Sequence, residues 1–264
     1  MGKIILFLLI FGFFSTVQGQ ELRPGFTCVF DRTLIFGASI SANTMHNYGL
    51  DFGFQLFGKG NFGLGPATVL TRDYAKRSVV WNMTASFGDP TGSEQIEKIL
   101  GHRKTHLASS MIGVDAFYWD AVWDMCDEGL PQKMIPQLIE FAKDNGIVLV
   151  LGKVPVEDPN KILWEKTPDY IRERAWHPPK PQCVAKINQL LVQQCLVGNQ
   201  CYILDLYQIV QTLNRGGTLK LENGSALNLE KMRPDGVHVS NEGSRYLQEQ
   251  ILSAFAKNRP ACVK

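Results

Sequence analysis

The sequence predicts a three-layer α/β/α sandwich in which helices cover both faces of a central, parallel, five-stranded sheet. Short apolar or β-branched runs alternate with longer helical patterns from one end of the chain to the other, and this order is typical of a parallel sheet joined by crossover helices. The runs are apolar at consecutive positions, which favours strands that are buried on both faces. No internal repeat or low-complexity segment interrupts the pattern.

Each predicted element has a local reason. Pro66 suits the first turn of a helix, Asn145-Gly146 suits a helix end, and Ser240 can cap the last helix, whose apolar residues follow helical spacing. The longer stretches 154–181 and 215–234 follow strand ends, where α/β proteins place ligand sites, and the second contains an Asn223-Gly224 turn. The strands are predicted at 33–36, 78–83, 107–112, 147–151 and 202–206, and the helices at 65–76, 93–103, 131–145, 183–197 and 241–257.

The first residues have the pattern of a secretory signal peptide. Lys3 precedes an apolar run from Ile4 to Phe14, and small and polar residues follow up to Gln20. We expect cleavage after Gly19, which makes 1–19 the signal peptide and 20–264 a single domain, secreted or periplasmic. The alternative is a retained membrane anchor. No later apolar run has the length of a membrane span.

Composition excludes some classes of partner and cofactor. The chain has 27 basic and 25 acidic residues and a net charge of +2, so we expect no nucleic-acid or strongly anionic partner. The six cysteines show no metal-ligand spacing and none lies near a histidine, so we expect no metal site. In an exported chain they predict disulfides instead, and no other cofactor is expected. They are Cys28, Cys126, Cys183, Cys195, Cys201 and Cys262.

Two short segments at opposite ends of the chain carry candidate chemistry. The first predicted strand runs into Gly37-Ala38-Ser39, a turn that can present a hydroxyl at the carboxyl edge of the sheet, and Asp235 and His238 lie three residues apart before the last helix. A serine hydroxyl is a poor nucleophile unless a base accepts its proton, and a carboxylate improves that base by fixing its tautomer. Without such a role, Ser39 would be a helix cap, His238 a surface or core histidine and Asp235 a turn residue.

These segments resemble the characteristic blocks of SGNH (GDSL-like) hydrolases. The turn Gly37 to Ile40 is similar to the first block, usually Gly-Asp-Ser, and the run Asp235 to His238 is similar to the last block, Asp-x-x-His. The order of the blocks and the terminal helix match as well, so the resemblance covers nearly the whole mature chain. It implies a flavodoxin-like fold and the activity of a serine esterase, with Ser39 as nucleophile and His238 and Asp235 as the activating pair.

The same resemblance implies an oxyanion hole with one departure from the family. The backbone N–H of Ser39 and of Gly88, within residues 86–89, would stabilise the oxyanion, but Asp115 stands where the family has an asparagine. An ionised carboxylate can only accept hydrogen bonds, and loss of one oxyanion donor costs roughly a hundred- to a thousandfold in rate. Two ways to supply the missing donor remain open. A raised pKa would let a protonated Asp115 donate, or Tyr118, Trp119 or a backbone amide would donate in its place.

The implied function is hydrolysis of carboxylic esters without a cofactor. The resemblance implies carbohydrate O-acetyl esters, short-chain esters or lipids as substrates. Because the chain is expected to be exported, we expect acetyl groups on cell-wall or extracellular polysaccharide first, and the partner is then a small-molecule or polysaccharide ester. An acyltransferase would use the same residues, and a degenerate binding protein would retain only the fold. The residues Phe117 to Trp119, with Trp123, either line a pocket at the sheet edge or belong to the core.

The implied sheet also suggests how the cysteines pair. Cys28 precedes the first strand and Cys262 follows the last helix, so both lie at the amino edge and are expected to join the termini. A second pair, Cys195 and Cys201, brackets a helix-to-strand turn. The remaining two, Cys126 and Cys183, would brace loops around the site.

Overall fold

The structure is a computed structural model of the chain. It describes residues 32–46, 66–67, 79–82, 91–102, 105–122, 129–167, 177–195 and 201–258. The predicted signal peptide, Gly88, Trp123 and three of the six cysteines lie outside these ranges.

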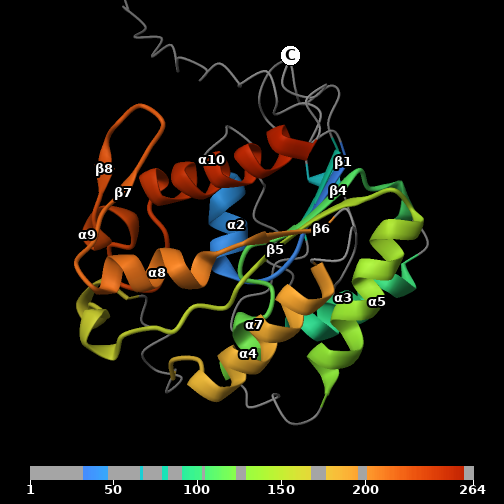
Figure 1. The fold of residues 1–264 in the computed structure, drawn as a ribbon, viewed down its shortest axis with the longest axis horizontal. Coiled ribbons are helices and arrows are strands. Elements are labelled where there is room, and N and C mark those ends of the chain that lie inside the picture. The colour runs from blue at the N-terminus through green and yellow to red at the C-terminus, as the bar shows by residue number, and fades with distance from the viewer. Residues whose placement is uncertain are drawn as a thin grey trace, which may run out of the picture.

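A mixed sheet forms the centre of the described fold (Figure 1). Its strand order is β2-β3-β1-β4-β5-β6, in which four parallel pairings join β3 to β6 and β2 pairs antiparallel with β3. The α/β fold with a parallel sheet is therefore confirmed. The strands are β1 (Arg32–Ile35), β2 (Pro66–Ala67), β3 (Val79–Asn82), β4 (Ser110–Gly113), β5 (Val148–Gly152) and β6 (Cys201–Leu204).

The edge strand β2 corrects two sequence expectations. The sheet has six strands and is not wholly parallel, and the helix predicted at 65–76 is wrong at Pro66 and Ala67, which pair with Trp81 and Val80 of β3. Proline has no N–H and fits an edge strand as readily as a first helical turn. The sequence pattern at Pro66 therefore did not separate the two structures.

Helices cover the two faces of the sheet, as Figure 1 shows. On one face lie α3 (Gly92–Gly101), α5 (Leu130–Asp144) and α7 (Pro181–Cys195), and on the other lie α2 (Ser39–His46), α8 (Leu206–Asn214) and α10 (Asn241–Asn258). A hydrophobic core lies on each face of the sheet, and neighbouring residues of β1 belong to different cores. Leu34 packs in the core under α3, α5 and α7, and Ile35 packs in the core on the opposite face. Both side chains are buried, as expected for a central parallel strand.

Local signals explain where several helices begin. A capping box at Thr91 and Glu94 starts α3, and Asp205 accepts from the backbone of Gln208 to start α8. The turn predicted at Asn223-Gly224 is confirmed and joins two short strands. The smaller elements are α4 (Tyr118–Val122), α9 (Leu229–Met232), β7 (Leu219–Lys220), β8 (Ala226–Leu227) and three 3-10 turns (Thr105–Leu107, Pro159–Lys161 and Trp164–Lys166).

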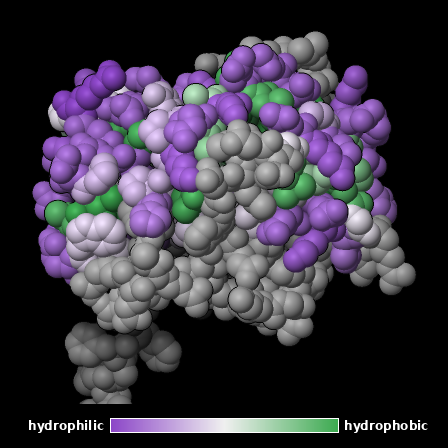
Figure 2. Space-filling model, turned by 90° about the horizontal axis from the view of Figure 1, so that it is seen from below, coloured by the Kyte–Doolittle hydropathy of each residue, from purple (hydrophilic) through white to green (hydrophobic). Residues whose placement is uncertain are grey.

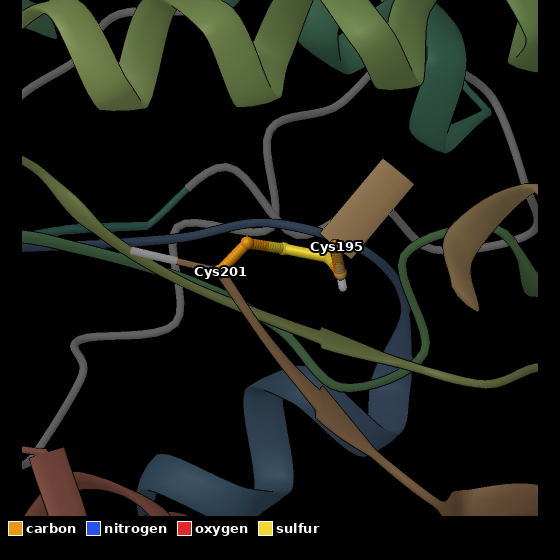
Figure 3. The surroundings of a disulfide bond; sticks show 2 residues. All are labelled: Cys195 and Cys201. Carbon is orange, nitrogen blue, oxygen red and sulfur yellow. A yellow bond between two sulfur atoms is a disulfide. The ribbon is translucent and has the colours of Figure 1, made fainter. Parts of the chain in front are cut away.

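A disulfide ties the end of α7 to the start of β6. Cys195 and Cys201 are bonded across a Cα–Cα distance of 5.1 Å (Figure 3), so the expected bond at this helix-to-strand turn is confirmed. Cys183 is buried and is also disulfide-bonded. The predicted Cys28–Cys262 and Cys126–Cys183 pairings each involve residues outside the described ranges and stay predictions.

The described surface is mixed in character. On the face shown in Figure 2, hydrophilic residues surround small hydrophobic areas, and the described part of that face shows no continuous apolar patch. None of the helices within the described ranges combines the length and hydropathy that a bilayer span requires.

Candidate active site

Ser39 lies at the carboxyl end of β1, where the strand turns into α2. It is the first residue of that helix and is partly exposed. The turn depends on Gly37, which has φ +112°, and a Cβ there would lie 2.7 Å from Ser41 Oγ and 2.9 Å from Asp115 Oδ1. Glycine is therefore required immediately before Ala38 and Ser39.

A buried amide side chain from α3 fixes this glycine. Gly37 N–H donates to Gln95 Oε1 at 2.7 Å, and Gln95 Nε2 donates to the carbonyl of Gly37 at 3.0 Å. Gln95 is 58 positions away in sequence and sits near the start of a helix, so no local motif predicts this contact. The two bonds hold the peptide groups on both sides of Gly37, which lead into the turn that carries Ser39.

Asp115, at the carboxyl end of β4, supports the same turn. Its Oδ1 accepts from Ala38 N at 2.9 Å, Ser41 N at 3.0 Å and Ser41 Oγ at 2.5 Å, and its Oδ2 accepts from Ile40 N at 2.8 Å. Burial raises the pKa of this carboxyl, and the four donors counteract that rise. Since each of these contacts comes from a donor, the Asp115 side chain acts as an acceptor for the turn. Its expected place in an oxyanion hole stays a prediction.

These contacts leave one amide of the turn uncommitted. The N–H groups of Gly37, Ala38, Ile40 and Ser41 are all bonded to Gln95 or Asp115, whereas within the described residues the N–H of Ser39 has no acceptor. It lies at the amino end of α2, where the helix dipole favours negative charge. In the described part of the chain, the Ser39 N–H is therefore available to donate to an oxygen atom of a ligand.

The other half of the candidate site is the turn before α10. His238 Nδ1 lies 2.6 Å from Asp235 Oδ2, while Asp235 Oδ1 accepts from the backbone N–H of Val237 at 2.8 Å and of His238 at 2.7 Å. Burial alone would raise the pKa of Asp235, but its bond to His238, the charge of that imidazole and the two amides lower it. With Nδ1 directed at a carboxylate, Nε2 is the ring nitrogen left to accept a proton.

The two halves meet at one small pocket. Ser39 and His238 both line it, although their positions are nearly two hundred residues apart in the sequence, and the space inside is about 20 Å³. Of the aromatic run, Phe117 and Tyr118 belong to the core. Tyr118 and Trp119 also line the pocket, with ring centroids 5.6 Å apart at 88°. The full lining is Ala38, Ser39, Ile40, Asp115, Tyr118, Trp119, Val237 and His238.

A larger groove of about 570 Å³ lies elsewhere, along α7. Its walls include Val184 and Asn188 of that helix, Lys153 after β5 and Tyr207 of α8. Among the described residues that line it, there is no serine, cysteine or threonine with a histidine beside it, whereas the small pocket has Ser39 and His238 together. The small pocket is therefore the candidate active site, in spite of its size.

The fold of the chain resembles that of solved hydrolases. A protein from Bacteroides fragilis NCTC 9343, assigned as an acylhydrolase, superimposes with a TM-score of 0.50 at 16% identity over 86% of this chain and 88% of its own. That likeness supports the α/β fold with a parallel sheet. The esterase EstA from Pseudoalteromonas sp. (TM-score 0.47, 11% identity, 86% and 97% covered) and a lipase/acylhydrolase from Enterococcus faecalis (0.48, 12%, 86% and 96%) also match.

Comparison by sequence gives no further relative. No family model matches the chain, and no curated protein matches it either.

Proposed function

We propose that this protein is a secreted serine esterase that removes short acyl groups, most readily O-acetyl groups on carbohydrate. The observation that carries the proposal is the pocket shared by Ser39 and His238, with Asp235 Oδ2 2.6 Å from the far nitrogen of that imidazole. A nucleophile, a base and a group that orients the base are the parts that acyl transfer requires.

The reaction proceeds in two balanced steps. Ser39 Oγ attacks the ester carbonyl carbon while His238 Nε2 takes the hydroxyl proton, and the tetrahedral intermediate collapses as His238 returns that proton to the departing alcohol. Water then attacks the acyl-enzyme with the same proton transfers and releases the carboxylic acid. Asp235 stays ionised throughout, which agrees with the lowered pKa of its carboxyl.

The oxyanion in each intermediate accepts from backbone amides. Ser39 N–H, which the contacts of Asp115 and Gln95 leave uncommitted, is the first donor, and Gly88 N–H is the second donor that we propose from the resemblance. Such donors act where charge develops in the transition state, which makes them worth about 3–4 kcal/mol each.

The size of the pocket supports a small acyl group. Space of about 20 Å³ corresponds to little more than one water molecule, which suits an acetyl methyl group better than a fatty-acyl chain. We therefore expect p-nitrophenyl acetate to be hydrolysed roughly tenfold faster than p-nitrophenyl octanoate. Acetylated polysaccharide tests the alcohol portion.

The decisive experiment compares wild type with Ser39→Ala and, as a matched control, Ser225→Ala in an exposed hairpin. Wild type and Ser225→Ala should hydrolyse p-nitrophenyl acetate and be labelled by a fluorophosphonate probe, whereas Ser39→Ala should do neither. If wild type is unlabelled and no faster than Ser39→Ala, the esterase proposal is lost.

That negative result would favour the rival, a binding protein on a degenerate hydrolase scaffold. The observation behind the rival is that the Asp115 side chain accepts in all four of its hydrogen bonds to the turn. It therefore supplies no donor to an oxyanion. An acyltransferase would label at Ser39 like the esterase. It would differ by forming an acylated sugar in preference to acetate when a carbohydrate acceptor is added.

A further inference from the structure

The turn that carries Asp235 and His238 rests against a distant segment, residues 157–163. Leu163 N–H donates to the carbonyl of Asp235 at 3.0 Å. Gly236, with φ +80°, packs so closely on this segment that a Cβ would lie 2.4 Å from the carbonyl oxygen of Lys161. The turn therefore takes its shape partly from residues that follow β5.

A buried ion pair forms the strongest link between the two. Arg233 Nη1 and Nη2 bond to the two carboxylate oxygens of Glu157 at 2.6 and 2.7 Å, and each side chain is 1% exposed. Burial alone would lower the pKa of Arg233, but the facing Glu157 carboxylate raises it, so the guanidinium is charged. Paired buried charges of this kind are costly to separate because the remaining charge has no water to solvate it.

The same guanidinium reaches the peptide that leads into His238. Arg233 Nε donates to the carbonyl of Val237 at 3.1 Å, and Nη2 also donates to it. The N–H of that same peptide, which belongs to His238, donates to Asp235 Oδ1. One planar peptide is thus held at both ends, by Arg233 on its oxygen and by Asp235 on its nitrogen.

We infer that Glu157 and Arg233 are positioning residues for His238: the carboxylate fixes the guanidinium, and the guanidinium fixes the Val237–His238 peptide and with it the imidazole. The effect on kcat that we expect from this inference rests on the proposed esterase function. Neither residue lines the pocket, so both act through His238 and not on the substrate.

The test uses Glu157→Gln, Arg233→Lys and the neighbour control Asp158→Asn. In Glu157→Gln the side chain keeps its shape, but an NH₂ group replaces one of the two oxygens that accept from Arg233. In Arg233→Lys the single ammonium group cannot bond to both Glu157 oxygens and to the Val237 carbonyl at once. Asp158 is one residue away, carries the same charge and bonds only within its own 3-10 turn. We expect kcat to fall about ten- to a hundredfold in the first two with KM within about twofold, and no change in Asp158→Asn.

A second readout does not depend on catalysis. The proton in the 2.6 Å contact between His238 and Asp235 should give a strongly downfield ¹H NMR signal, present in wild type and Asp158→Asn and lost or shifted in Glu157→Gln and Arg233→Lys. If wild type shows no esterase activity, this signal still tests the positioning role, so the two failures are distinguishable. Should one variant not give a cooperative melt, the other decides.

The inference is overturned if either variant folds with wild-type kcat and an unchanged downfield signal. It is also overturned if wild type shows no such signal, because the contact that the pair is said to hold would then be absent. A rise in KM at constant kcat would place the pair in substrate binding and would equally contradict it.

Discussion

At the scale of single residues, Asp115 has a buried carboxyl group whose hydrogen bonds support the turn that carries Ser39. Its two oxygens receive three backbone N–H groups and the hydroxyl of Ser41. A carboxylate has acceptor capacity for all of them, whereas an asparagine amide would present an NH₂ group to at least one donor.

Asp115→Asn, which introduces the residue found at this position in the hydrolases that the sequence resembles, is therefore expected to reduce the stability of this protein. One N–H or hydroxyl of the turn would lose its acceptor, at a cost of about 1–3 kcal/mol in the free energy of unfolding. Urea unfolding of the variant and of Asp144→Asn, an exposed control at the end of α5, would measure this cost. Higher activity in Asp115→Asn with unchanged stability would show that the asparagine is preferred here too.

Asp235→Asn tests the second carboxylate. Its amide oxygen can still accept from the backbone of Val237 or His238, but an NH₂ group facing His238 Nδ1 favours the wrong imidazole tautomer. We expect kcat to fall by about 10³–10⁴ with little change in melting temperature. A loss of less than about tenfold in a folded variant would mean that Asp235 does not orient the base.

The supporting residues of the site could not be predicted from the sequence, because their contacts join distant positions. Ser39 follows a strand directly, and Asp235 and His238 are three residues apart, so each half of the site has a local pattern. In contrast, Gln95 contacts a residue 58 positions away, and the hydrogen bonds of Asp115 to the turn span 74 to 77 positions. Such partners are specified by the sheet order, which the sequence shows only coarsely.

At the scale of elements, helix α3 links a buried acid to the nucleophile turn. Asp120 of α4 accepts from Ser93 N–H at 3.3 and 3.4 Å at the amino end of α3, and the same helix carries Gln95. Burial raises the pKa of Asp120 from 3.8 to about 6, although bonds from Ser93 and Gly92 counteract the rise. The fold therefore favours the protonated form of this carboxyl.

This shift predicts a pH dependence of stability. A carboxyl whose pKa is raised on folding adds stability below its unfolded pKa, here 3.8, and loses it as pH rises through about 6. Asp120→Asn has no such titration, so the stability of wild type relative to this variant should decline between about pH 4 and 7, by on the order of 3 kcal/mol. Melting temperatures of both proteins across this range would check it. Parallel curves would mean that Asp120 is not perturbed.

The elements themselves could largely be predicted, and the failures have physical causes. All strands from β1 to β6 except β2 fall within two or three residues of the positions expected from their apolar runs. Strand β2 is short and contains a proline that suits either structure. The sequence pattern predicts no helix at α8, and the strand expected at 202–206 runs past the end of β6 into the first residue of that helix. The pattern therefore located five of the six strands and the longer helices, but it missed α8, whose buried residues belong to one of the two cores.

At the scale of the whole molecule, the disulfide and the candidate active site lie at opposite edges of the sheet. Strands β1 and β4 lead from their carboxyl ends to Ser39 and Asp115, whereas Cys201 is the first residue of β6 and therefore lies at the amino edge. In a parallel sheet these two edges are opposite. The Cys195–Cys201 disulfide is thus placed away from the candidate active site.

Removing this disulfide should reduce stability and leave activity intact. The bond closes a loop with a sequence separation of 6, and the entropy model for so short a loop gives a stabilisation of about 2 kcal/mol. The double variant Cys195→Ser, Cys201→Ser should therefore unfold at lower urea concentration while kcat and KM keep their wild-type values. A folded double variant that loses activity would show that the amino edge of the sheet is coupled to the site.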